Sequence, residues 1–120
     1  MKDLRFSSGD RKVSWFDEEG EVTLEFGCIV SSHYLPETGL IYVLAGRKKK
    51  EVLLRIFDTS GELLCEFQPP DGFTFWYVTT HPECTVAVAC ESREKIDGWH
   101  GWHFSIDIKE QTLTRICPAY

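Results

Sequence analysis

The feature that most constrains the fold is a short pattern that recurs along the chain. Residues 16–22 are Phe-Asp-Glu-Glu-Gly-Glu-Val, residues 57–63 are Phe-Asp-Thr-Ser-Gly-Glu-Leu, and a degraded copy occupies residues 106–111. A second pattern lies between these copies, as Val-Ser-Ser-His at 30–33 and Val-Thr-Thr-His at 78–81. Two independent patterns in the same order, at intervals of about 40 to 50 residues, indicate a repeated structural unit.

The Asp-x-x-Gly part of the pattern predicts a tight hairpin turn. The Asp side chain accepts hydrogen bonds from the turn backbone, and Gly adopts a positive φ without steric penalty. The flanking segments are short and rich in β-branched, aromatic and aliphatic residues, as strands are. We expect strands at 12–16, 22–26, 27–32, 40–45, 52–57, 63–67, 73–80, 85–90, 102–108 and 112–117. Because no sustained helical period is present, the chain is expected to be all-β, with about ten or eleven strands.

The repeats group these strands into units of four. One unit covers residues 27–68, a second covers 73–118, and residues 1–26 supply the last two strands of an earlier unit, all within one domain spanning 1–120. A four-stranded antiparallel unit of about 40 to 50 residues is typical of a β-propeller blade. A closed propeller needs at least about four blades, so we expect an open half-propeller of about two and a half. Its open sheet edges must then be covered.

Charge and cysteine usage restrict the partners and the compartment. Thirteen Lys and Arg against 19 Asp and Glu give a formal net charge of −6. This argues against nucleic acid as a partner, whose phosphates require a basic patch, and favours a cationic protein. No apolar run is long enough to cross a membrane, and the first residues lack the apolar core of a secretory signal. Five cysteines without a Cys-x-x-Cys pair are typical of reduced thiols, so we expect a cytoplasmic chain.

The histidines and cysteines raise the question of a zinc centre. The residues with suggestive spacing are His81, Cys84, Cys90, His100 and His103. In a regular strand, however, residues i and i+3 point to opposite faces, so His100 and His103 are expected to be separated. Cys84 and Cys90 border an aliphatic strand, where cysteine commonly packs as a small hydrophobic residue. We therefore expect neither a metal nor another cofactor.

Catalysis is also disfavoured by the sequence. No P-loop, nucleophile elbow or dinucleotide-binding motif is present. His33 and His81 occupy equivalent repeat positions, which is more typical of strand-end histidines than of two catalytic bases. The expectation is a protein that is not an enzyme, although a small enzyme that uses the His and Cys set stays as one hypothesis.

The predicted binding site is a loop face. Loops after the second and fourth strands of each unit share one face, at 46–51, 68–72 and 91–101. The last of these is an insertion, and insertions confined to one face of a repeat protein commonly carry binding. Carboxylates attract a cationic partner and exposed aromatics anchor it. The predicted partner-binding residues are Asp71, Glu91, Glu94, Asp97, Trp99 and His100.

The tryptophans of the chain are expected to divide between this face and the core. Trp99 either anchors the partner or caps the core. The core candidates are Trp15, Trp76 and Trp102.

The Phe-Asp-x-x-Gly-Glu turns and short strands, in an acidic chain of this size, resemble the small immunity proteins of bacterial contact-dependent growth inhibition systems. Some of those proteins have half-propeller folds. The resemblance implies a cytoplasmic inhibitor that binds one cognate toxin domain, often an RNase, one to one and blocks its active site. A nuclease holds RNA phosphates in a basic cleft, which an acidic surface matches. No residue is carried over by position, so the site residues rest on loop position and charge alone.

A second hypothesis is a non-catalytic interaction module. Such a module self-associates as a homodimer through its open sheet edges, or completes another β-sheet assembly.

Overall fold

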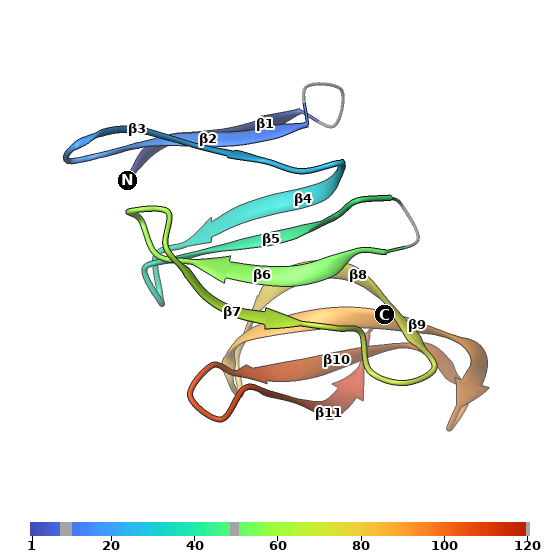
Figure 1. Ribbon diagram of the computed structural model, residues 1–120. Helices are drawn as coiled ribbons and strands as arrows, with labels where there is room; N and C mark the ends of the chain where they lie inside the picture. Colours follow the sequence, from blue (N-terminus) through green and yellow to red (C-terminus); the bar gives the residue numbers. More distant parts are fainter. Residues whose placement is uncertain (8–10, 49–50, 120) are drawn as a thin grey trace. The chain divides into compact units, whose positions relative to one another are not determined.

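The computed structural model describes residues 1–7, 11–48 and 51–119 (Figure 1). Within these residues the chain is all-β, with eleven strands in three antiparallel sheets and no helix. The chain divides into two compact units, Met1–Glu66 and Phe67–Tyr120. The all-β expectation is therefore confirmed.

The first unit holds two sheets whose strands follow one another in sequence order. The three-stranded sheet comprises β1 (Lys2–Ser7), β2 (Lys12–Asp17) and β3 (Gly20–Glu25). The four-stranded sheet comprises β4 (Cys28–Leu35), β5 (Leu40–Gly46), β6 (Leu53–Phe57) and β7 (Leu63–Phe67), the last strand ending at the boundary with the second unit.

The core of the first unit follows the alternation of its strands. Val13 and Trp15 of β2 point inward, and they pack with buried residues of the second sheet, which are Ile29, Ile41, Val43, Ala45 and Phe57. The indole Nε1 of Trp15 donates a hydrogen bond of 2.7 Å to the carbonyl of Thr59. A strand of the first sheet is thereby tied to the turn between β6 and β7.

That turn has the chemistry that its sequence predicts. Asp58 Oδ1 accepts hydrogen bonds from the backbone N–H groups of Ser60 and Glu62, at 2.9 and 3.0 Å, and from the Ser60 hydroxyl. Gly61 has φ 93°, a value that L side chains rarely adopt. These hydrogen bonds lower the pKa of Asp58, the Ser60 side chain contributing most.

The second unit is one antiparallel sheet in the order β11-β10-β9-β8. Its strands are β8 (Phe73–His81), β9 (Thr85–Ile96), β10 (Trp99–Asp107) and β11 (Thr112–Pro118). Residues 86–90 of β9, the central run Val-Ala-Val-Ala-Cys, are buried on both faces. Burial raises the pKa of the Cys90 thiol to about 12.

Two sequence-based expectations about strands are wrong. Residues 1–26 were expected to supply two strands, but β1 adds a third, paired antiparallel with β2. Residues 91–101 were expected to form a loop, yet β9 continues to Ile96 and β10 starts at Trp99. The reversal needs only Asp97 and Gly98, with φ 50° and 86°, the positive pair that a two-residue type I′ hairpin requires.

Candidate functional site

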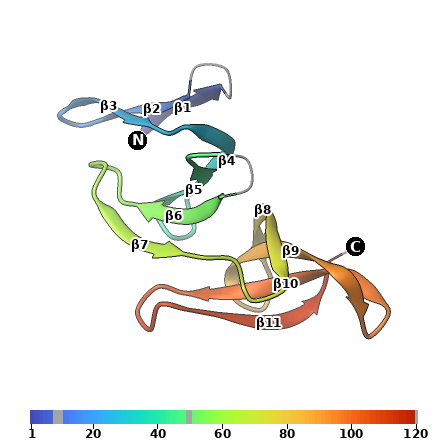
Figure 2. The same cartoon turned by 45° about the vertical axis from the view of Figure 1, so that its right-hand side comes forward.

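The β9–β10 hairpin extends past its neighbouring strands. β8 begins at Phe73, opposite Ser92, and β11 ends at Pro118, opposite Trp102. Within the described part of the chain, no third strand pairs with the hairpin beyond these residues. The projecting end of this hairpin is coloured orange to brown in Figure 1 and Figure 2.

The base of the hairpin is a bulge held by hydrogen bonds. Trp99 pairs with Ile96 but Gly101 pairs with Glu91, so β9 contributes more residues than β10 between the two pairs. The Ser92 hydroxyl donates to the backbone carbonyls of Glu94 and His100, and the His100 Nδ1–H donates to the Ser92 carbonyl at 3.0 Å. Bulges of this kind re-aim side chains and are frequent beside functional sites.

All six predicted site residues lie at this end of the sheet, and all are exposed. Five of them are on the hairpin. The sixth, Asp71, lies in a turn closed by the hydrogen bond from Phe73 N–H to the Pro70 carbonyl, 2.9 Å long, which leads into β8. The next residue of β8, Thr74, is paired with Glu91, so this turn and the hairpin base are neighbours.

The structure also assigns local structural roles to two of these six residues. Asp97 holds a positive φ in the hairpin turn, and the His100 ring is bound to the Ser92 carbonyl. Two exposed cations that were not predicted as site residues, Arg93 and Lys95, lie on the same hairpin. The hairpin surface is therefore mixed in charge rather than uniformly acidic.

The tryptophans divide differently from the expectation. Trp15 and Trp102 are buried, as expected, and Trp102 donates its Nε1–H to the Trp99 carbonyl at 3.2 Å. Trp76 was expected in the core, but it is 43% exposed. The pairing of β8 with β9 is irregular between Phe75 and Tyr77, and this bulge turns Trp76 outward beside Gly101. With Trp99 at 41% exposure, two large aromatics are accessible at this end of the sheet.

A second group of reactive side chains lies elsewhere in the same unit. His81, His103 and Cys117 offer ligand atoms that all lie within 4.8 Å of one another. Cys117 Sγ is 3.4 Å from His81 Nε2 and 3.7 Å from His103 Nδ1. All three residues are partly buried.

The strand register explains how the group assembles. Tyr77, Ala89, His103 and Cys117 are successive cross-strand partners, so their side chains share one face of the sheet. His81 lies further along β8, at the opposite edge of the sheet from β11, yet its ring reaches Cys117. The sheet is thus strongly coiled over the small side chains of β9, in keeping with the right-handed twist of strands.

The hydrogen bonds of His81 limit the chemistry of this group. His81 Nδ1 accepts a hydrogen bond from the Glu83 backbone N–H at 3.2 Å, so the neutral ring carries its proton on Nε2, facing Cys117. In this tautomer Nε2 cannot remove the thiol proton. His103 has a lowered pKa, chiefly because burial disfavours its charged form and also because of the nearby His81. A hydrogen bond from the His103 ring to the Pro118 backbone acts in the opposite direction and raises the His103 pKa, less strongly.

The grouping differs from the candidate zinc ligands considered from sequence. His100 is bound to Ser92, and Cys90 is buried within β9, so neither joins His103. Cys84 donates its S–H to the Val86 carbonyl at 3.3 Å; its pKa is raised by burial and, less strongly, by Glu83 and Cys117. Cys117 was not considered as a ligand, because only the β10–β11 register places it opposite His103.

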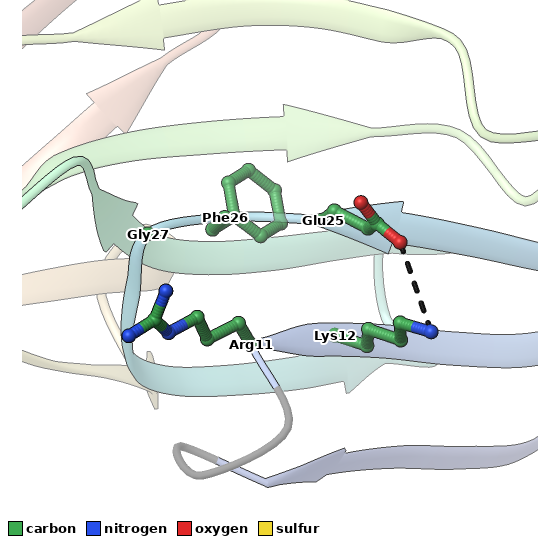
Figure 3. A pocket seen from close by; sticks show the side chains of 5 residues that line it. All are labelled: Arg11, Lys12, Glu25, Phe26 and Gly27. Atoms are coloured by element: carbon green, nitrogen blue, oxygen red, sulfur yellow. Dashed lines mark ion pairs between the residues drawn. The ribbon is translucent and has the colours of Figure 1, made fainter.

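The first unit carries a separate surface hollow of about 380 Å³ (Figure 3). It is lined by Arg11, Lys12, Glu25, Phe26 and Gly27. Lys12 Nζ and Glu25 Oε1 form an exposed ion pair at 3.7 Å, which satisfies part of the charge in the hollow. Among the residues that the structure describes, the lining contains no cysteine, histidine or hydroxyl that would serve as a nucleophile or base.

Comparison with known proteins identifies no relative. No protein-family model, curated protein or solved structure matches the chain. Across the described ranges 1–7, 11–48 and 51–119, no helix of the length and apolar character needed to cross a membrane is present.

Proposed function

We propose that this chain is an immunity protein that binds a basic toxin domain, with an RNase as the expected toxin, and blocks its active site without catalysing a reaction. The observation that carries the proposal is the projecting β9–β10 hairpin. Exposed carboxylates and an exposed tryptophan occur together on it, at the end of the sheet that also holds Asp71 and Trp76.

Charge supports the choice of a cationic partner. The whole chain carries a formal net charge of −6, so its long-range field attracts a basic protein and repels nucleic acid. The mixed charges of the hairpin itself then act at short range. Complementary charges across an interface fix its register and exclude wrong partners more than they add affinity.

The aromatic residues supply the anchoring part of the proposed interface. Tryptophans dominate binding energy where they become buried at the centre of a contact. Trp99 lies near the tip of the hairpin and Trp76 beside its base, so one contact can cover both. A projecting hairpin also fits a concave surface, and an enzyme active site is concave.

We extend the proposal to the fold. Each four-stranded sheet follows its strands in sequence order, which is the arrangement within a propeller blade. The Asp-x-x-Gly turn recurs at the same place in the first two sheets, at residues 17–20 and 58–61. We propose that β4–β7 and β8–β11 are two blades of a half-propeller and that β1–β3 is an incomplete one.

The test is affinity capture from the native host with two matched charge variants. One variant carries Glu91→Gln, Glu94→Gln and Asp97→Asn, where Asn keeps the preference for positive φ at the turn. The control carries Glu18→Gln, Glu19→Gln and Glu21→Gln, three exposed residues at the β2–β3 turn. Both change the formal net charge from −6 to −6 + 3 = −3.

We expect a single basic partner with the wild type and the control, weaker capture at moderate than at low salt, and loss of the partner with the hairpin variant. Equal capture by both variants would remove the hairpin from the interface. A circular dichroism melt of each variant ensures that an unfolded protein is not mistaken for a lost contact.

The alternative, self-association through open edges, has one specific observation in its favour. β7 lies at the edge of its sheet and exposes Leu63 and Leu64, at 47% and 40%. Exposed apolar residues on an edge strand favour pairing with another strand. Sedimentation equilibrium of the isolated protein decides this point: a stable dimer that Leu63→Lys converts to a monomer supports the alternative.

A further inference from the structure

We propose that His81, His103 and Cys117 form a binding site for a divalent transition metal, with Zn²⁺ as the expected ion. Spacing along the chain led us to expect no metal, because it does not bring Cys117 together with the two histidines; the site is also separate from the proposed partner-binding hairpin. The three ligands come from three different strands, β8, β10 and β11.

The spacing of the ligand atoms fits tetrahedral coordination. With Zn–S near 2.3 Å and Zn–N near 2.0–2.1 Å, a tetrahedral angle places S and N about 3.5 Å apart. Cys117 Sγ lies 3.4 Å from His81 Nε2 and 3.7 Å from His103 Nδ1. The third edge, between the two imidazole nitrogens, is at most 4.8 Å, against about 3.3 Å in a tetrahedral ion, so the two rings draw together when an ion binds all three.

The donor types select the class of metal. One thiolate and two imidazoles suit Zn²⁺ and its neighbours in the first transition row, whereas Mg²⁺ and Ca²⁺ require oxygen ligands. Each ligand is partly buried, so the ion is reachable from solvent while its ligands are held by packing. The His103 ring, for example, packs edge-on against Tyr77 with ring centroids 6.3 Å apart.

Binding of the metal requires two protons to move. The Cys117 thiol releases its proton to solvent as its sulfur bonds the metal. The His81 proton moves from Nε2 to Nδ1, since Nε2 must present its lone pair to the ion. The Glu83 N–H then turns from Nδ1 to water, which the exposed position of Glu83 permits.

Three protein ligands leave one position of a tetrahedral ion to water. The Cys84 thiol interacts electrostatically with Cys117, but its S–H is held by the Val86 carbonyl. The site thus has the ligand count of an open zinc centre rather than of a closed structural one.

The experiment is a titration of the full-length, reduced and chelator-treated protein with Co²⁺, which replaces Zn²⁺ and reports thiolate ligation through a charge-transfer absorption band. We expect saturation at one equivalent and loss of the band on adding Zn²⁺. Cys117→Ser should abolish the band. His81→Gln and His103→Gln should each weaken binding by at least about tenfold, since losing even an outer-shell partner costs that much.

Matched controls come from the first unit. His33→Gln removes the exposed histidine at the repeat position equivalent to His81, and Cys28→Ser removes a partly buried cysteine. Both should keep the band and the stoichiometry. Zn²⁺ should also raise the melting temperature of the wild type and of both controls but not that of Cys117→Ser.

Three results would each overturn the proposal: no thiolate band at micromolar protein, a band that survives in Cys117→Ser, or a band lost equally in Cys28→Ser. If Cys117→Ser fails to fold by circular dichroism, His103→Gln takes its place. Unchanged Co²⁺ affinity in that folded variant would likewise contradict the site.

Discussion

Gly61 offers a quantitative test of how the repeated turn stabilises the first unit. It has φ 93°, and a Cβ added there would lie 2.7 Å from Val22 Cγ1, closer than real Cβ contacts come. Alanine at this position therefore meets two separate penalties. One arises from its own backbone, and the other from the side chain of β3 that faces it.

The two penalties have known sizes. A non-glycine residue in the left-handed region costs about 1–2 kcal/mol. Forcing a methyl group against a neighbouring side chain costs about 1–3 kcal/mol. We expect Gly61→Ala to lower the free energy of unfolding by about 2–5 kcal/mol, a large fraction of the stability of a small domain.

Urea unfolding followed by circular dichroism measures this loss, and two further variants separate its parts. Gly39→Ala is the control, because Gly39 has φ 71° with nothing within 4 Å of the added Cβ. It should lose only the backbone part, about 1–2 kcal/mol. Val22→Ala should lower the free energy of unfolding less in the Gly61→Ala background than in the wild type, because it removes the clash.

Two outcomes would contradict this account of the turn. If Gly61→Ala and Gly39→Ala lose the same stability, Val22 does not crowd the turn. If Gly61→Ala is neutral, the chain does not adopt the positive φ there, and the assignment of a common turn to the repeats is wrong.

Further predictions concern the core, a thiol and a carboxylate. Trp15→Phe should lower the free energy of unfolding by about 1–3 kcal/mol, since it leaves the Thr59 carbonyl without its donor, and urea unfolding measures this. Cys90, with a pKa of about 12, should be about one part in ten thousand thiolate at pH 8 and should resist alkylation by iodoacetamide, read by mass spectrometry, until the protein unfolds. The folded pKa of Asp58 lies below its ordinary value of 3.8, so its stabilising effect is full above pH 3.8 and is lost as pH falls through the folded pKa. The stability difference between wild type and Asp58→Asn should therefore shrink in acid, and a difference that is the same at neutral and acid pH would contradict the hydrogen bonding of this turn.

Much of the fold followed from local sequence chemistry. The turn from Asp58 to Gly61 is specified by residues within five positions of each other, so its hydrogen bonds could be predicted without knowledge of the remainder of the chain. The strands between turns were found from composition for the same reason. β1 was missed because its charged sequence becomes a strand only through pairing with β2, a contact from outside the segment.

The candidate sites likewise depend partly on local sequence and partly on tertiary contacts. The hairpin was found as an insertion between repeats, although its strand character and the outward turn of Trp76 depend on bulges that composition does not indicate. The His81–His103–Cys117 group depends on the register of β10 with β11 and on the coiling of the whole sheet. Both are set by tertiary packing, so spacing along the chain directed attention to the wrong partners for His103.

The most direct test of the central claim is to measure the enzymatic activity of the captured basic partner while the wild-type protein is added. The account predicts that activity falls to zero at one molar equivalent, and that the hairpin variant with Glu91→Gln, Glu94→Gln and Asp97→Asn needs a large excess for the same effect. A partner that keeps its activity in a stoichiometric complex, or a captured partner with no activity to inhibit, would contradict the assignment as an immunity protein.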